Sequence, residues 1–149
     1  MGKIMLGRID HQLDEKGRMR IPAKFRDSIG SSFTMLPGKQ ECVYIVSNDS
    51  ASEILKPFLS TNPYLESDEQ NQIANDIISK MAEIEEDAQG RFVFPKQLAQ
   101  TYKIRKDVVV IGKGTYLEVW GKEVWDARYK VLDPDKLKTM LNNLTKREG

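Results

Sequence analysis

The sequence predicts an α+β fold that is mainly β, with two tandem β units and helices at the periphery. Three observations lead to this prediction: a motif that occurs twice, an apolar alternation that ends in proline in both copies, and the same order of strand and turn signals after each copy. The 149 residues are enough for one ordinary domain with a buried core. No apolar run reaches the length of a bilayer.

The duplicated motif lies in residues 14–25 and, without a gap, in residues 87–98, at an offset of 73 residues. Each copy reads Asp-x-x-Gly-Arg-apolar-x-apolar-Pro. The first copy contributes Asp14, Gly17, Arg18, Met19, Ile21, Pro22 and Phe25, and the second contributes Asp87, Gly90, Arg91, Phe92, Phe94, Pro95 and Leu98. A string of this length and order is far more specific than the bare Asp-x-x-x-Arg spacing, so it indicates an internal repeat.

Each copy predicts a strand, a turn, a strand, a short helix and two further strands. In the turn, Asp can accept backbone hydrogen bonds and Gly can adopt a positive φ, and the proline suits the start of the helix. The first unit is expected at strands 6–13, 18–21, 32–36 and 41–46 with a helix over 22–29. The second is expected at strands 81–85, 91–94, 108–111 and 116–120 with a helix over 95–102 and a hairpin turn at 112–114.

Four further helices are predicted outside the repeats, over 50–59, 66–81, 122–131 and 135–144. The chain is therefore divided into a first unit, acidic connecting helices, a second unit and C-terminal helices, at residues 1–47, 48–80, 81–121 and 122–149.

The net charge of +1 hides an uneven distribution. Residues 1–26 carry +4 and residues 91–149 carry +6, whereas residues 48–90 carry −8. Folding can gather the two basic segments on one face and direct the acidic segment elsewhere. A local basic site is therefore expected in a nearly neutral protein.

Two interpretations of the duplicated turns remain open on the residues alone. Arg18 and Arg91 could each pair with guanine or phosphate, with lysines such as Lys16 positioning the DNA backbone. Alternatively, the Asp14–Arg18 and Asp87–Arg91 pairs could only close surface hairpins, each contributing under about 1 kcal/mol. Duplication does not separate the two, because a structural turn is copied together with a functional one.

The motif residues also carry a resemblance to the MraZ family of bacterial transcriptional regulators. In the first half these are Gly7, His11, Leu13-Asp14, Lys16-Gly17-Arg18, Ile21-Pro22 and Lys24-Phe25-Arg26; in the second, Asp87, Gln89-Gly90-Arg91, Pro95, 107–112, 118–120 and Trp125. The resemblance covers about residues 4 to 130. It implies two swapped-hairpin units of the SpoVT/AbrB type that share one core with pseudo-twofold symmetry.

The resemblance further implies a closed ring of subunits that binds tandem G-rich repeats in double-stranded promoter DNA, upstream of the division and cell-wall gene cluster. Arg18 and Arg91 are then the expected DNA contacts, and Lys16, Arg20, Lys24 and Gln89 are further candidates in or beside the turns. Asp14, Gly17, Asp87 and Gly90 are expected to fix the turns. Because the second turn has Gln89 where the first has Lys16, the first is expected to contribute more.

Other classes fit the sequence less well. His11 is the only histidine and Cys42 is the only cysteine. The sequence contains neither a nucleophile-elbow motif around a serine nor a phosphate-binding loop. No catalysis, metal, cofactor or small-molecule substrate is therefore expected. The short apolar start of the chain does not resemble a signal peptide, which favours a cytoplasmic, nucleoid-associated protein without membrane contact. The alternatives are an AbrB-like global regulator, an antitoxin, or an adaptor that binds a partner through the acidic helices.

Overall fold

The computed structural model describes residues 4–59 and 62–148, with side chains up to residue 146. Residues 1–3 of the first segment, 60–61 of the acidic connecting segment and 149 of the C-terminal segment lie outside the described residues. The first repeat contains β1 (Met5–Gln12), β2 (Arg18–Arg20), η1 (Ala23–Phe25), α1 (Arg26–Ile29), β3 (Ser32–Pro37) and β4 (Val43–Ser47). The second contains β5 (Ala82–Glu85), β6 (Arg91–Val93), α4 (Lys96–Thr101), β7 (Asp107–Gly114) and β8 (Leu117–Gly121).

The remaining elements connect or follow the repeats. The connection consists of α2 (Asn48–Leu55), η2 (Lys56–Phe58), η3 (Pro63–Leu65) and α3 (Asp68–Lys80), and the C-terminal part consists of α5 (Lys122–Arg128) and α6 (Pro134–Glu148). Among the helices of the described residues, none is both long enough and apolar enough to span a bilayer.

The strands of the two repeats are interleaved. Six strands form one antiparallel sheet in the order β1-β7-β8-β4-β3-β5, and β2 pairs with β6 in a separate two-stranded ribbon. The first strand of each repeat therefore pairs with the third strand of the other, β1 with β7 and β5 with β3. The strand order reads the same when the repeats are exchanged, which confirms the predicted swapped-hairpin fold with pseudo-twofold symmetry.

One continuous core lies between the sheet and the ribbon. The apolar positions of the duplicated motif all enter it, with side chains at most 4% exposed: Met19, Ile21, Phe25, Phe92, Phe94 and Leu98. Phe92 also packs edge to face on Phe33, at 5.1 Å between ring centroids. Cys42 is fully buried in a neighbouring cluster, and this burial raises the pKa of its thiol to about 12. Cys42 is thus a core side chain.

The predicted hairpin turn at 112–114 is wrong. Gly112 continues β7 and pairs with Gly7 of β1 and Leu117 of β8. A Cβ at Gly112 would lie only 2.8 Å from the Met5 carbonyl carbon, so glycine is needed there for the close approach of β1. The chain reverses instead at Thr115 and Tyr116, where Lys113 N–H donates to the Tyr116 carbonyl.

Two predicted helices also differ from the structure. The helix expected over 22–29 is divided into η1 and α1 at Phe25, whose backbone angles of φ −108° and ψ −2° interrupt the α geometry while its ring enters the core. The helix expected over 122–131 ends at Arg128 because Tyr129 is extended, and α6 starts at Pro134.

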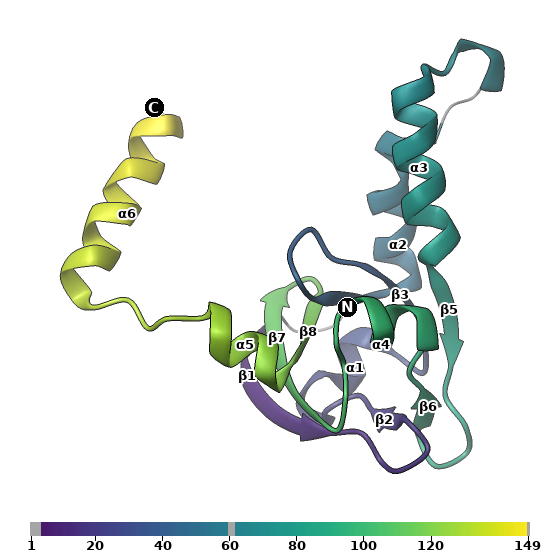
Figure 1. Ribbon diagram of the computed structural model, residues 1–149, viewed down its shortest axis with the longest axis horizontal. Coiled ribbons are helices and arrows are strands. Elements are labelled where there is room, and N and C mark those ends of the chain that lie inside the picture. Colours follow the sequence, from purple (N-terminus) through teal and green to yellow (C-terminus); the bar gives the residue numbers. More distant parts are fainter. Residues whose placement is uncertain (1–3, 60–61, 149) are drawn as a thin grey trace.

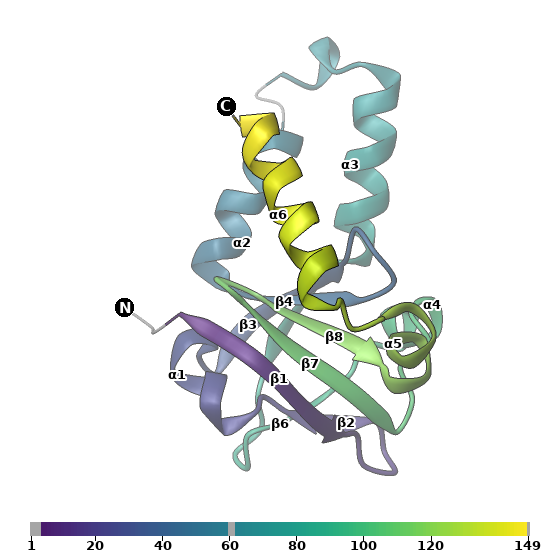
Figure 2. The same cartoon turned by 90° about the vertical axis from the view of Figure 1, so that its left-hand side faces the viewer.

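The molecule has a lower and an upper part in the view of Figure 1. The β2–β6 ribbon and both motif turns lie at the bottom, whereas α2 and α3 project upward as a helical hairpin (Figures 1 and 2). In Figure 1, α6 also rises on the upper side but at the opposite end of the long axis from this hairpin. The acidic connecting helices therefore lie away from the turns.

The symmetry is broken at one pair of equivalent positions. Leu13 N–H donates to the Lys106 carbonyl, and Glu86 N–H donates to the Ser31 carbonyl in the same way, so Leu13 and Glu86 correspond. Leu13 is buried and lies with Ala99 beside the core. In the other half, Glu86 forms a 2.9 Å ion pair with Arg26, which takes the place of Ala99. Two apolar residues at or beside the core in one half thus correspond to an ion pair in the other.

This asymmetry predicts how the chain responds to mutation. Arg26→Ala should lower the free energy of unfolding by about 1–3 kcal/mol, because the Glu86 side chain is only 4% exposed and its Oε1 already has no hydrogen-bond partner. The double variant Arg26→Ala/Glu86→Leu, which reproduces the Leu13–Ala99 arrangement, should recover most of that loss. Urea unfolding at a fixed protein concentration measures both, and equal losses in the two variants would contradict the prediction.

Candidate nucleic-acid interface

The first motif turn is built around one carboxylate. Oδ1 of Asp14 accepts hydrogen bonds from the backbone N–H groups of Lys16 and Arg18, both at 2.9 Å, and Oδ2 accepts one from Arg18 Nε at 2.7 Å. Gly17 closes the turn with a φ of +73°, which glycine adopts without strain. The turn therefore holds the Arg18 guanidinium through its Nε.

The second turn repeats this geometry. Asp87 accepts from Gln89 N–H at 2.8 Å, from Arg91 N–H at 2.9 Å and from Arg91 Nε at 3.1 Å, and Gly90 has a φ of +75°. The hydrogen bond from the backbone N–H of the motif arginine is the largest effect that holds the pKa of each aspartate below its usual 3.8, and partial desolvation opposes it. Both aspartates are thus ionised at neutral pH.

The ribbon brings the two turns together. In the β2–β6 register, Met19 lies opposite Phe92 and both face the core. The alternate residues face outward, with Arg18 opposite Val93 and Arg20 opposite Arg91. Like charges directly opposite each other on neighbouring strands destabilise a sheet, which makes this outer face favourable for an anionic ligand.

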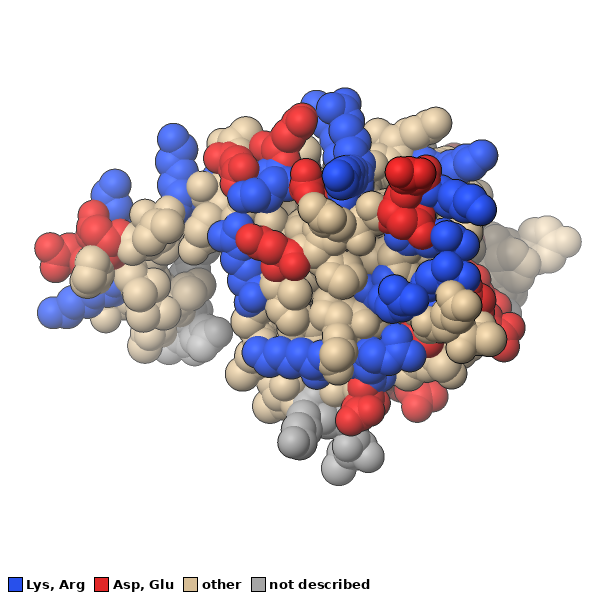
Figure 3. All heavy atoms as spheres, turned by 90° about the horizontal axis from the view of Figure 1, so that it is seen from below, with Lys and Arg blue, Asp and Glu red and all other residues tan. Residues whose placement is uncertain are grey.

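A groove of about 850 Å³ lies beside the first turn. Five basic side chains line it: Lys16 and Arg18 from the turn, and Lys96, Arg105 and Lys106 from the second repeat. At the second turn, the residues equivalent to those three are Ala23, Gly30 and Ser31, none of them charged. The first turn therefore lies in a more basic surrounding than the second. Figure 3 shows the lower face of the molecule, where Lys and Arg predominate over Asp and Glu.

Sequence reasoning missed Lys96, Arg105 and Lys106. They are about 80 to 90 residues away from the first turn in the chain. The pairing of β1 with β7 brings Arg105 and Lys106 beside it, and the β2–β6 ribbon brings Lys96. The signal that could have found them is the Arg105-Lys106 pair directly before a strand of the second unit, combined with the swapped pairing that the repeat implies.

Not all basic residues near the first motif reach this face. Arg20 lies on the ribbon and donates from Nε to the Gln89 carbonyl of the second turn, at 3.1 Å. Lys24 lies instead on η1 with its Nζ above Gly7 of β1. Arg26 is held by Glu86. Of the six sequence-predicted DNA contacts, the turns and ribbon unite Lys16, Arg18, Arg20, Gln89 and Arg91, and Lys24 lies apart.

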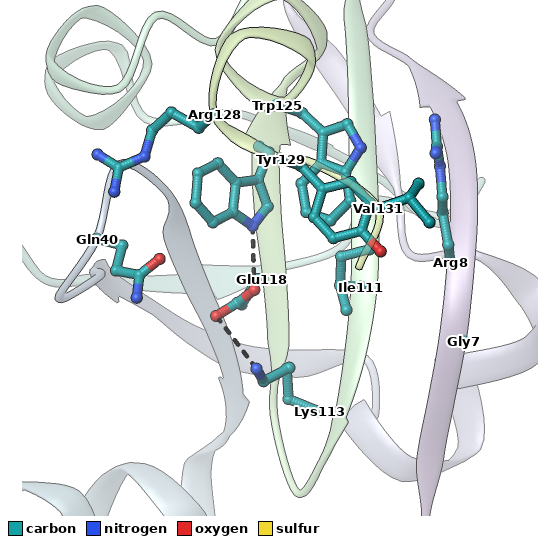
Figure 4. Close-up of a pocket in the computed structure, with 11 residues that line it drawn as sticks. Gly7, Arg8, Gln40, Ile111, Lys113, Glu118, Trp125, Arg128, Tyr129 and Val131 are labelled. Carbon is teal, nitrogen blue, oxygen red and sulfur yellow. Dashed lines mark hydrogen bonds and ion pairs between the residues drawn. The ribbon is translucent and has the colours of Figure 1, made fainter. Parts of the chain in front are cut away.

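A second hollow, on the outer face of the sheet, is lined by aromatic residues (Figure 4). Trp125 of α5 stacks on Tyr129 with ring centroids 4.3 Å apart, and the Arg8 guanidinium lies 5.6 Å from the Trp125 ring. Glu118 accepts from Trp120 Nε1 at 3.0 Å. These contacts pack α5 on the sheet and hold Arg8 on a face of the molecule other than the ribbon. Within residues 4–59 and 62–148, no three His, Cys, Asp or Glu side chains are grouped to hold a metal ion.

Comparison with known proteins gives a consistent result. The family described as "MraZ protein, putative antitoxin-like" matches residues 4–63 and 77–147. A protein called transcriptional regulator MraZ from Caldanaerobacter subterraneus subsp. tengcongensis is 36% identical over 130 residues, which cover 87% of this chain and 90% of that protein. A protein with the same name from Syntrophomonas wolfei subsp. wolfei is 37% identical, over 82% of this chain and 84% of that protein. Another from Desulforamulus reducens is 30% identical, over 95% of this chain and 97% of that protein.

The turn geometry predicts a pH dependence. The lowered pKa of Asp14 means that the stabilisation it gives the turn is complete above pH 3.8 and is lost as the pH falls through the lowered value. Arg18→Ala should raise the pKa of Asp14 but leave it below 3.8, because the backbone hydrogen bond remains. An NMR titration of the Asp14 carboxyl measures this shift; no shift on losing the guanidinium would contradict the ion pair.

Proposed function

The chain belongs to the MraZ family, and from this premise we propose that it is a sequence-specific, DNA-binding transcriptional regulator. We further propose that it represses the division and cell-wall gene cluster by binding tandem G-rich repeats of its promoter as a ring of subunits. Three relatives at 30–37% identity carry the name of a transcriptional regulator, which supports the regulatory role. Such a regulator acts at the nucleoid, in the cytoplasm.

The observation that carries the proposal is the outward face of the ribbon. Three arginines, Arg18, Arg20 and Arg91, extend from two short antiparallel strands whose opposite face is anchored in the core. A two-stranded ribbon is narrow enough to enter the major groove of DNA, and an arginine held by Nε can still donate from its terminal amino groups to guanine or phosphate. The fixed turns spare the DNA complex the cost of ordering these side chains.

The groove beside the first turn supports a division of roles within this interface. Lys96 and Lys106 are exposed and suit phosphate contacts, which position a protein on the duplex without reading its sequence. Arg105 lies in the same groove and is 3.4 Å from the exposed Glu123, a weak pair that DNA can replace. We therefore assign sequence reading to Arg18, with Arg91 as its weaker counterpart, and backbone contact to the lysines.

The test compares three single variants against duplexes with intact or scrambled G-rich repeats. Arg18→Ala should weaken binding to the intact repeat by about 1–3 kcal/mol and reduce the preference over the scrambled duplex. Lys106→Ala should weaken binding to both duplexes equally and lower the slope of log affinity against log salt by about 1. Fluorescence anisotropy at several salt concentrations measures all of these values.

Lys56→Ala is the matched control, because Lys56 lies on the upper helical hairpin in an exposed pair with Glu53. It should leave affinity and salt slope unchanged. If the unmodified protein binds both duplexes equally and weakly, sequence-specific regulation is wrong. If Arg18→Ala and Lys56→Ala bind alike while the protein prefers the intact repeats, the reading site lies elsewhere on the molecule.

A further inference from the structure

The C-terminal helix α6 has an apolar stripe that is left exposed in the part of the chain that the structure describes. Leu137, Met140, Leu141 and Leu144 follow the i, i+3, i+4, i+7 spacing of one helix face, and each is 45–55% exposed. Figure 1 shows α6 standing apart from the rest of the molecule, connected by an extended segment after α5. A helix of 15 residues is only marginally stable in water without tertiary packing, so this stripe needs a partner surface.

A suitable surface lies on the helical hairpin, which we define as residues 48–80. Between this hairpin and the sheet is an apolar groove of about 590 Å³. Its lining includes Tyr44, Ile54, Phe58, Ile73, Ile77 and Tyr116. Ile73 on α3 is 46% exposed and opens the groove to the outside. At about 1.5 Å per residue, α3 and α6 have comparable lengths, so the two helices can pack along most of their extent.

The charges of the two elements are complementary. The helical hairpin contains six acidic and two basic residues, whereas residues 134–148 contain four basic and two acidic ones. Lys136 and Lys138 flank the apolar stripe of α6. The groove itself is lined by Lys39, Asp76 and Lys80, with Asp76 paired to Lys80 at 3.0 Å, so the complementary charge belongs to the hairpin as a whole and surrounds the groove. Complementary charge around an apolar centre favours one orientation of docking and discriminates against self-pairing of two α6 helices.

The positions of α6 and the helical hairpin indicate that the two surfaces meet between two copies of the chain. The helical hairpin and α6 lie at opposite ends of the long axis (Figure 1). Joining two copies at these unlike surfaces is a head-to-tail contact, which repeats from subunit to subunit and closes into a ring when the rotation allows. Both elements are on the upper side, so such a contact leaves the ribbon and the basic groove free.

We propose that α6 packs its apolar stripe into the groove of the helical hairpin of a neighbouring copy of this chain, and that this contact links the subunits. The inference deepens the proposed ring and rests on the oligomer named there. It does not depend on DNA, so it is tested on the protein alone.

The first experiment adds a charge to each face of α6 in turn. Leu141→Lys places an ammonium in the apolar stripe, and Asn142→Lys places the same group on the opposite, polar face. Sedimentation velocity should show the oligomer dissociated in Leu141→Lys and intact in Asn142→Lys, with unchanged far-ultraviolet circular dichroism outside the helical loss expected for α6. An oligomer that survives Leu141→Lys overturns the proposal.

The second experiment identifies the partner surface. Subunits with Leu141→Cys are mixed with subunits carrying Ile73→Cys, and a short bismaleimide joins accessible thiols; Cys42 is buried and stays unreactive in folded protein. A covalent dimer specific to the mixture is the expected result. A dimer from Leu141→Cys alone would show that α6 pairs with α6. Cross-linking confined to one chain in the double variant Ile73→Cys/Leu141→Cys would show that α6 folds back on its own hairpin. Either result overturns the proposal.

The subunit contact and the regulatory function can be contradicted separately. Loss of the oligomer in Leu141→Lys together with no preference for the G-rich duplex in the unmodified protein would retain the subunit contact and remove the regulatory function. Conversely, Leu141→Lys should bind a duplex with a single repeat as strongly as the unmodified protein does, because its ribbon is unchanged, and should lose only the gain in affinity from several repeats in tandem.

Discussion

The pairing of β1 with β7 is the constraint on which the rest of the structure depends. Neither repeat contains a partner for its own first strand, since β1 needs β7 and β5 needs β3. The backbone N–H and C=O groups of these strands are satisfied only when both repeats fold together. The chain must therefore fold as one unit, and the duplicated sequence cannot be regarded as two domains that happen to be joined.

The same pairing creates the interface. Because β7 lies along β1, the residues just before β7 are brought to the end of β1, where the first turn begins. The basic groove beside Arg18 is thus composed of side chains from both repeats, and it would not exist in either repeat alone. The ribbon is likewise shared, since each repeat contributes one of its strands, β2 or β6, and one turn that carries an arginine.

The repeat motif predicted the fold class, the strand order within each unit and both turns, because those features depend on residues that are close in sequence. It could not predict the groove, since the contact of Arg105 and Lys106 with the first turn depends on the pairing of distant strands. For the same reason Lys24 was expected in or beside the turns, yet its position on η1 directs it to Gly7 of β1 instead. Gly112 suggested a turn because the sequence alone does not show that the backbone of β1 lies close to this glycine.

Symmetry and its departures lead to a physical reason for assembly. The ribbon has only three residues in each strand, a much smaller reading element than a recognition helix, so one subunit can contact few base pairs. The two turns also differ, because the residues equivalent to Lys96, Arg105 and Lys106 are uncharged at the second turn. Weak contacts of this kind become specific when several subunits engage successive repeats, since each bound subunit raises the effective concentration of the next. Under the proposed function, the regulator therefore depends on its subunit contact as much as on its arginines, and the upper helices, remote from the ribbon, are placed to form that contact without obstructing the DNA.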